Sequence, residues 1–187
     1  MIHHLRYTPM PRFAAAVLSI ALVLAPSLPA AAAEQGWTVA PAPSDHPDLR
    51  AATVANADGH RLYVWELVDE ERSQIYCEMH LADGLRFADA MPTYRIDGGA
   101  AVDTGEIRDA GEAQNALWAH VGESVAFWLL SPLPGAAENA GAPLAPWLDG
   151  REVAISFRTA DGGERTTRFS LAGAAEAIRG ATDDTQN

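Results

Sequence analysis

Two short segments near the C-terminus decide the fold: EVAISFR at residues 152–158 and ERTTRFSL at residues 164–171, separated by TADGG at 159–163. Apolar and polar residues alternate in the first segment, which is typical of a β-strand with one buried face. The sequence Asp-Gly-Gly between the segments favours a tight turn. We therefore expect a β-hairpin.

Burial sets the expected register of this hairpin. A two-residue loop would place the apolar side chains opposite Thr166, Arg168 and Ser170. A three-residue loop, with a glycine in the left-handed conformation, buries more apolar surface. We therefore predict a loop of residues 161–163 and three buried pairs: Phe157 with Thr167, Ile155 with Phe169, and Val153 with Leu171.

A second hairpin is expected upstream, from strands at 62–68 and 74–81. Pairing Val68 with Gln74 places apolar or aromatic residues together on one face, as the two-residue period requires. On that prediction one face carries Tyr63, Trp65, Leu67, Ile75, Cys77 and Met79, and the other carries Glu66, Tyr76, Glu78 and His80.

Two short helices complete the predicted fold. One spans about 110–121, after a capping-box spacing of Asp109 and Glu112. The other spans about 171–179, with Ser170 as its N-cap and Gly180 at its end. We predict a single α+β domain, mainly an antiparallel β-sheet or sandwich of about six to eight strands.

The N-terminus reads as an export signal. Basic residues precede the apolar run at 13–25, and small residues at 31–33 suit a signal peptidase. The run is too short to span a bilayer, so we expect cleavage next to Ala33 and no membrane insertion afterwards. The predicted parts are a signal peptide at 1–33, a globular β-rich domain at 34–182 and a disordered tail at 183–187. The expected location is the periplasm of a Gram-negative bacterium, or the medium.

Charge and composition limit the partners. The chain without residues 1–33 holds 11 arginines against 25 acidic residues, a net charge of −14. Such a field repels nucleic acid and favours a cationic or neutral partner. The chain has no lysine, which excludes lysine-dependent phosphate or Schiff-base chemistry. Its one cysteine, Cys77, excludes an internal disulfide.

The candidates for chemistry are weak. Ser124 lies in a sequence like a nucleophile elbow, but here a predicted helix precedes and a strand follows, the reverse of what that motif needs. Cys77 and His80 are three residues apart and face opposite sides of a strand. Glu78 and His80 share a face but give two ligands, fewer than zinc requires, so we expect them to be solvated. We assign no catalytic residue, metal or cofactor.

Possible binding residues come from two other places. A proline-rich loop at 131–146 precedes Trp147, and we name Trp147, Trp118 and Leu144 as candidate binding residues. Arg158 and Arg168 flank Ser156 on the outer face of the C-terminal hairpin and suggest an anion site. Nearby acidic residues can pair with them, and we interpret these arginines as ordinary surface: Glu152, Asp161 and Glu164.

Two regions carry a resemblance to a known family. They are the Gly-Trp-Thr-Val sequence at 36–39 and the C-terminal part from Leu144 through the hairpin to Ile178. In both, the chain resembles exported proteins of the invasion-associated locus B type from alphaproteobacteria. The resemblance implies a β-rich envelope or secreted protein without known catalysis. The disulfides usual in that family do not carry over to a chain with one cysteine.

Together these patterns predict an exported soluble protein that is not an enzyme and acts by binding a protein or a cell-envelope component. Two alternatives stay open. One is a small exported hydrolase that uses carboxylates or His80 in a cleft under the 131–146 loop. The other is a carrier whose tryptophans enclose a small apolar ligand. The sequence leaves the oligomeric state open.

Overall fold

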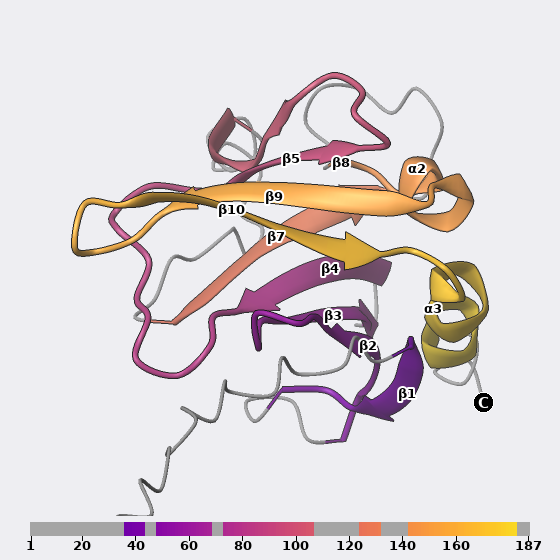
Figure 1. The fold of residues 1–187 in the computed structure, drawn as a ribbon. Helices are drawn as coiled ribbons and strands as arrows, with labels where there is room; N and C mark the ends of the chain where they lie inside the picture. The colour runs from indigo at the N-terminus through magenta and orange to yellow at the C-terminus, as the bar shows by residue number, and fades with distance from the viewer. Residues whose placement is uncertain (1–35, 44–47, 69–72, 107–123, 132–141, 183–187) are drawn as a thin grey trace, which may run out of the picture. The chain divides into compact units, whose positions relative to one another are not determined.

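The computed structural model describes residues 36–43, 48–68, 73–106, 124–131 and 142–182, all within one compact unit, Ala31–Asn187. About half of these residues form two β-sheets. Two short helices are also described, α2 (Ala145–Asp149) before the last two strands and α3 (Ala174–Thr182) after them (Figure 1). The predicted signal peptide, the helix expected at 110–121 and the tail at 183–187 lie outside the described residues.

The larger sheet has the strand order β1-β2-β3-β4-β7-β8. Neighbouring strands are antiparallel except for β7 and β8, which are parallel. The strands are β1 (Thr38–Pro41), β2 (Arg50–Ala55), β3 (Arg61–Val68), β4 (Ser73–His80), β7 (Val125–Ser131) and β8 (Ala142–Pro143).

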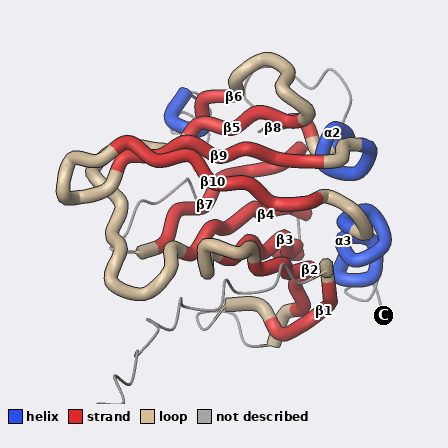
Figure 2. Tube along the Cα trace, viewed as in Figure 1, coloured by secondary structure: helices blue, strands red, loops and turns tan. Residues whose placement is uncertain are grey.

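The smaller sheet has the order β10-β9-β5-β6 and is antiparallel throughout. Its strands are β5 (Thr93–Ile96), β6 (Val102–Asp103), β9 (Glu152–Arg158) and β10 (Glu164–Ser170). Helix α3 packs against α2 and against β1, β2 and β3 of the larger sheet, and Figure 2 shows both helices at the same end of the strands. Among the described residues, no helix is long and apolar enough to cross a membrane.

These observations confirm the predicted fold class, a single β-rich domain of mainly antiparallel sheets with short helices. The described strands number ten, more than the six to eight expected. The bounds expected for the last helix are wrong. Leu171 extends the pairing of the hairpin through a bond to Arg151, and Gly173 turns the chain at φ +86, so the helix begins at Ala174. Gly180 lies inside the helix, where it packs closely against Val39.

The C-terminal hairpin has the predicted faces but not the predicted partners. Its loop has five residues, 159–163, because the backbone N–H of Thr159 donates to the carbonyl of Gly163 and closes the turn there. The partners are therefore displaced by two residues, which keeps every side chain on its expected face. The observed pairs are Phe157 with Arg165, Ile155 with Thr167, and Val153 with Phe169.

The register predicted for the upstream hairpin is wrong by one residue. Val68 pairs with Ser73, and Trp65 pairs with Tyr76 where we expected Cys77. Cys77 pairs instead with Val64. The one-residue shift places Tyr63, Trp65 and Leu67 on the opposite face from Cys77.

The larger sheet consequently buries side chains on both faces. The main core contains residues of both sheets, including Val64, Cys77 and Trp128 from the larger and Ile155 and Phe169 from the smaller. A second cluster on the other side of the larger sheet consists of Ala42, Ala51, Trp65, Tyr76 and Leu129. Among the described residues, the smaller sheet contributes to the main core with one face only.

Candidate functional site

The face of the smaller sheet that points away from the main core, hereafter the outer face, carries a row of hydroxyl groups. Ser156 of β9 pairs with Thr93 of β5 on one side and with Thr166 of β10 on the other. Paired residues project to the same side of a sheet, so the three hydroxyls form a line across three strands. The oxygens of Ser156 and Thr166 are 2.8 Å apart and share a hydrogen bond.

Charged pairs flank this row on both sides. On one side Arg158 donates to Glu164 at 3.0 Å. On the other side Arg168 donates to Glu152. These are the pairings that the sequence suggested for these arginines, and exposed pairs of this kind add little stability. They place guanidinium donors and carboxylate acceptors side by side on a solvated surface.

A third arginine, Arg95 of β5, lies on the opposite side of Ala154 from Arg168. Ala154 pairs with both arginines, so all three residues share the outer face. The guanidinium of Arg95 donates to the backbone carbonyl of Gly99 at 2.9 Å. Among the residues that the structure describes, Arg95 makes no ion pair with a carboxylate.

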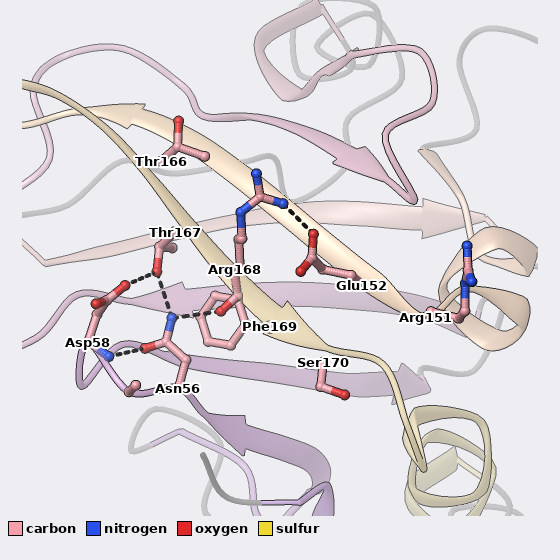
Figure 3. A pocket seen from close by; sticks show the side chains of 10 residues that line it. Asn56, Asp58, Arg151, Glu152, Thr166, Thr167, Arg168, Phe169 and Ser170 are labelled. Atoms are coloured by element: carbon pink, nitrogen blue, oxygen red, sulfur yellow. Dashed lines mark hydrogen bonds and ion pairs between the residues drawn. The ribbon is translucent and has the colours of Figure 1, made fainter. Parts of the chain in front are cut away.

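Two hollows adjoin this face and share one lining residue, Thr166; the first also extends past the edge strand β10 to the β2–β3 turn. Their volumes are about 400 and 470 Å³, within the range of ligand sites in proteins. The first is lined by Asn56, Ala57, Asp58, Arg151, Glu152, Thr166, Thr167, Arg168, Phe169 and Ser170 (Figure 3). The second is lined by Ala90, Met91, Thr93, Ser156, Phe157, Arg158, Glu164, Arg165 and Thr166.

One wall of the first hollow is a hydrogen-bond network from the β2–β3 turn to β10. The amide of Asn56 is 3% exposed and donates to the hydroxyl of Thr167 at 2.6 Å and to the carbonyl of Arg168 at 2.9 Å (Figure 3). That hydroxyl donates to the carboxylate of Asp58 at 2.7 Å. The side-chain oxygen of Asn56 accepts from the backbone N–H groups of Asp58 and His60. The network therefore ties the larger sheet to the edge of the smaller one.

The opposite wall is positioned by Asp97, which follows β5 with φ at +49. Its carboxylate accepts backbone hydrogen bonds from Arg151 and Glu152, both at 3.0 Å. These bonds, the one from Arg151 first, lower the pKa of Asp97 because they stabilise the ionised form. Asp97 thus fixes the start of β9, where Glu152 meets Arg168.

Glu78 and His80 form a second polar group, on the face of the larger sheet that carries the Trp65–Tyr76 cluster. The imidazole of His80 lies 2.7 Å from one carboxylate oxygen of Glu78. The other oxygen of Glu78 accepts a hydrogen bond from the indole N–H of Trp65 at 3.1 Å. The ring of Tyr63 packs against that of His80 with 4.9 Å between centroids. The sequence predicted the shared face correctly, but the expectation that both side chains are solvated is wrong for Glu78, which is 8% exposed.

The residues named as binding candidates do not gather at a surface. Trp147 is fully buried between Tyr94 and Trp128, with ring centroids 5.2 and 6.4 Å away. Leu144 is also buried in the main core. Trp118 lies outside the described residues. In the described structure, Trp147 and Leu144 therefore serve the core and offer no surface to a partner.

Cys77 is buried, as the sequence predicted, although the register that led to this prediction was wrong. Desolvation, with a smaller contribution from the charge of Glu78, raises the pKa of its thiol. Ser124 leads directly into β7, so a strand follows it as expected, while the predicted helix before it is outside the described residues. The described residues contain no group of three or more side chains placed to bind a metal ion.

No family model, curated protein or solved structure matches the chain. The resemblance to the invasion-associated locus B family stays a prediction.

The sequence identified two arginines of the outer face but not all residues of the candidate site. The alternation in β9 and β10 placed Ser156, Arg158 and Arg168 on the outer face. The parts that were missed are Arg95 and Thr93, which reach this face only because β5 pairs with β9 across a sequence separation of about 60 residues. A short strand such as β5 carries no sequence signal for its partner.

Proposed function

We propose that the protein is an exported, non-enzymatic binding protein that recognises a protein or cell-envelope component through the outer face of the smaller sheet. The apolar run at 13–25 and the small residues at 31–33 support export to the periplasm or beyond. The proposal for the binding face rests on one observation, the row of hydroxyls flanked by Arg–Glu pairs where two hollows share the lining residue Thr166.

This face is suited to binding because its donors and acceptors are already placed. Thr166, Arg158 and Arg168 are exposed on strands, and the opposite side of the same strands is anchored in the main core by Ile155 and Phe169. Groups on a rigid strand lose little conformational freedom when a partner binds, which favours affinity.

The hydrolase alternative receives support from the Glu78–His80 pair, which resembles a carboxylate–imidazole dyad. Its position argues against the cleft imagined for it. His80 pairs with Val125 at the beginning of β7, whereas the described ends of the proline-rich loop, Ser131 and Pro143, pair with each other at the far end of that strand. Both carboxylate oxygens of Glu78 are also engaged, one by His80 and one by Trp65.

The carrier alternative needs tryptophans around a cavity. Trp128 and Trp147 instead pack against each other and against Tyr94, and both are fully buried. Rings in mutual contact fill the space that an apolar ligand would need.

The test is sedimentation of the purified mature protein with washed envelope fractions of the host. Replacing Thr166 with Glu puts bulk and charge at the junction of the two hollows, and we expect binding to fall at least tenfold. Thr38→Glu is the matched control, because Thr38 is also an exposed threonine on a strand but lies in β1 of the larger sheet.

Equal binding by both variants at equal melting temperature would reject this face as the binding surface. Loss of function in cells on replacing Glu78 with Gln or His80 with Ala, at unchanged stability, would favour the hydrolase. Intact mass of the protein recovered from the envelope tests cleavage next to Ala33, and a full-length species retained in the membrane would contradict export.

A further inference from the structure

We infer that the ligand of the outer face is an acidic polysaccharide, whose carboxylate groups are bound by Arg95 and Arg168 and whose hydroxyls bond to the row at Thr93, Ser156 and Thr166. The inference rests on the proposed function and adds the chemistry of the partner.

Local charge is the first reason. The outer face of β9 and β10 carries two arginines, Arg158 and Arg168, balanced by two acidic residues, Glu152 and Glu164, in a chain whose net charge without residues 1–33 is −14. Arg95 adds a further positive charge from the neighbouring strand. The outer face is therefore the place where this acidic protein can accept an anionic ligand.

The geometry around Ala154 is the second reason. Arg95 and Arg168 stand on either side of this small residue, each one strand away from it. Adjacent strands are about 4.8 Å apart, so the two Cα atoms are separated by roughly 10 Å. Two arginine side chains extending over a methyl group from that distance can reach the same carboxylate, and a guanidinium binds a carboxylate through paired N–H groups.

The available charge is the third reason. Arg168 is shared with Glu152, but Arg95 donates to a backbone carbonyl, which leaves its positive charge uncompensated by any carboxylate of the described structure. A carboxylate is a stronger partner for a guanidinium than a neutral carbonyl. A ligand anion can therefore bind Arg95 without displacing an acidic side chain.

The row of hydroxyls favours an anionic sugar polymer over anions that have no hydroxyl groups. The hydroxyls of Thr93, Ser156 and Thr166 each donate and accept, as sugar hydroxyls do. All three line the second hollow, and Thr166 also lines the first, so the polar surface continues from one hollow to the other. Charge from the arginines and alternating donors and acceptors from the hydroxyls match a chain of carboxylated sugars.

The experiment is calorimetric titration of the purified mature protein with three polymers of similar length at low salt. Polygalacturonate carries both carboxylates and sugar hydroxyls, dextran carries hydroxyls alone, and poly-glutamate carries carboxylates alone. We expect polygalacturonate to bind at least tenfold more tightly than either of the others, with an affinity that falls as sodium chloride is raised.

Arg95→Gln is expected to weaken polygalacturonate binding about tenfold without lowering the melting temperature. Arg61→Gln is the matched control, because Arg61 is an exposed strand arginine of the larger sheet, and it should leave binding unchanged. Equal binding of polygalacturonate and poly-glutamate, no binding of polygalacturonate, or equal effects of the two arginine variants would each overturn the inference.

Competition separates this inference from the proposed function. If Thr166→Glu abolishes envelope binding but polygalacturonate does not compete with the envelope, the face binds a partner of different chemistry and only this inference fails. If Thr166→Glu leaves envelope binding intact, the proposed binding face itself is wrong.

Discussion

The two hairpins of this protein differ in how many of their faces are buried. In the β9–β10 hairpin one face packs in the main core and the other is polar and solvated. In the β3–β4 hairpin both faces bury apolar side chains, because Val64 and Cys77 enter the main core while Trp65 and Tyr76 form the second cluster. Alternation identifies the inward face only where the other face is polar.

The same difference separates side chains that stabilise the fold from side chains that we propose for binding. Both faces of the β3–β4 hairpin are used in packing, so a change on either side alters the core. The outer face of β9–β10 is exposed to solvent, and we propose that it binds the partner, so its side chains can change with little effect on the fold.

The largest contrast is expected in thiol reactivity. Cys77, which is fully buried, reacts only when the sheet opens, and its raised pKa further reduces the thiolate. In a Cys77→Ala background, a cysteine introduced by Ser156→Cys lies on the exposed outer face. We expect a thiol-reactive dye to label this variant at least about 10³-fold faster than native Cys77, since opening of a core strand is rare. Similar rates would contradict the assignment of the two faces.

The next effect is on stability. Tyr76 is 1% exposed and stacks on Trp65 with ring centroids 4.7 Å apart. Replacing Tyr76 with Ala should lower the free energy of unfolding by roughly 3 kcal/mol, the cost of removing a buried aromatic ring. Thr166→Val on the outer face should change it by less than about 0.5 kcal/mol. Urea denaturation measures both, and a small loss in Tyr76→Ala would show that the second cluster is not packed.

A smaller effect is expected where the two sheets are joined. Asn56→Ala removes the donor to Thr167 and Arg168 and should cost about 1–3 kcal/mol, because buried polar groups lose their partners. Thr167→Val removes the other end of the network. In a double-mutant cycle we expect a coupling energy of at least 0.5 kcal/mol, typical of residues in one hydrogen-bond network. Strictly additive losses would mean that the network does not join the sheets.

The smallest effect concerns pH and His60. Its Nδ1 accepts from the backbone N–H of Ala82 at 2.9 Å, and burial lowers its pKa more than the charge of Asp58 raises it. Because the folded pKa is below the unfolded value of about 6.5, the native state binds fewer protons, and stability falls as the pH drops below 6.5. His60→Asn keeps an acceptor but does not titrate. We expect it to lose less stability than the wild type between pH 7.5 and 5, measured by urea denaturation.

An equal loss in both proteins over that pH range would show that His60 does not titrate with folding.

The sequence predicted those parts of the fold that depend on local pattern. The inward faces of β9 and β10 followed from the alternation of Val153, Ile155 and Phe157 with polar residues. The pairing partners of these residues could not be predicted, because the turn closes with a backbone hydrogen bond from Thr159 to Gly163, which the side-chain pattern does not indicate. The register of β3–β4 failed because Trp65 and Val64 are both apolar, so burial could not choose between them.

The candidate site was predictable in part for the same reason. One hairpin carries Ser156, Arg158 and Arg168. Because side chains alternate between the two faces of a strand, the sequence alone places these three residues on one face. Arg95 and Asn56 join them through long-range contacts, one by strand pairing and one by a side-chain bond to β10. Trp147 was named for its position after a proline-rich loop, but the packing of Tyr94 and Trp128 around it places it in the core.

Nuclear magnetic resonance mapping of the ¹⁵N-labelled mature protein during titration with the solubilised envelope polymer tests the central claim most directly. We predict that amide shift changes concentrate on β5, β9 and β10 at Thr93, Ser156 and Thr166, while β3 and β4 stay unperturbed. Shift changes centred on Trp65, Tyr76 and His80 of the larger sheet would contradict it.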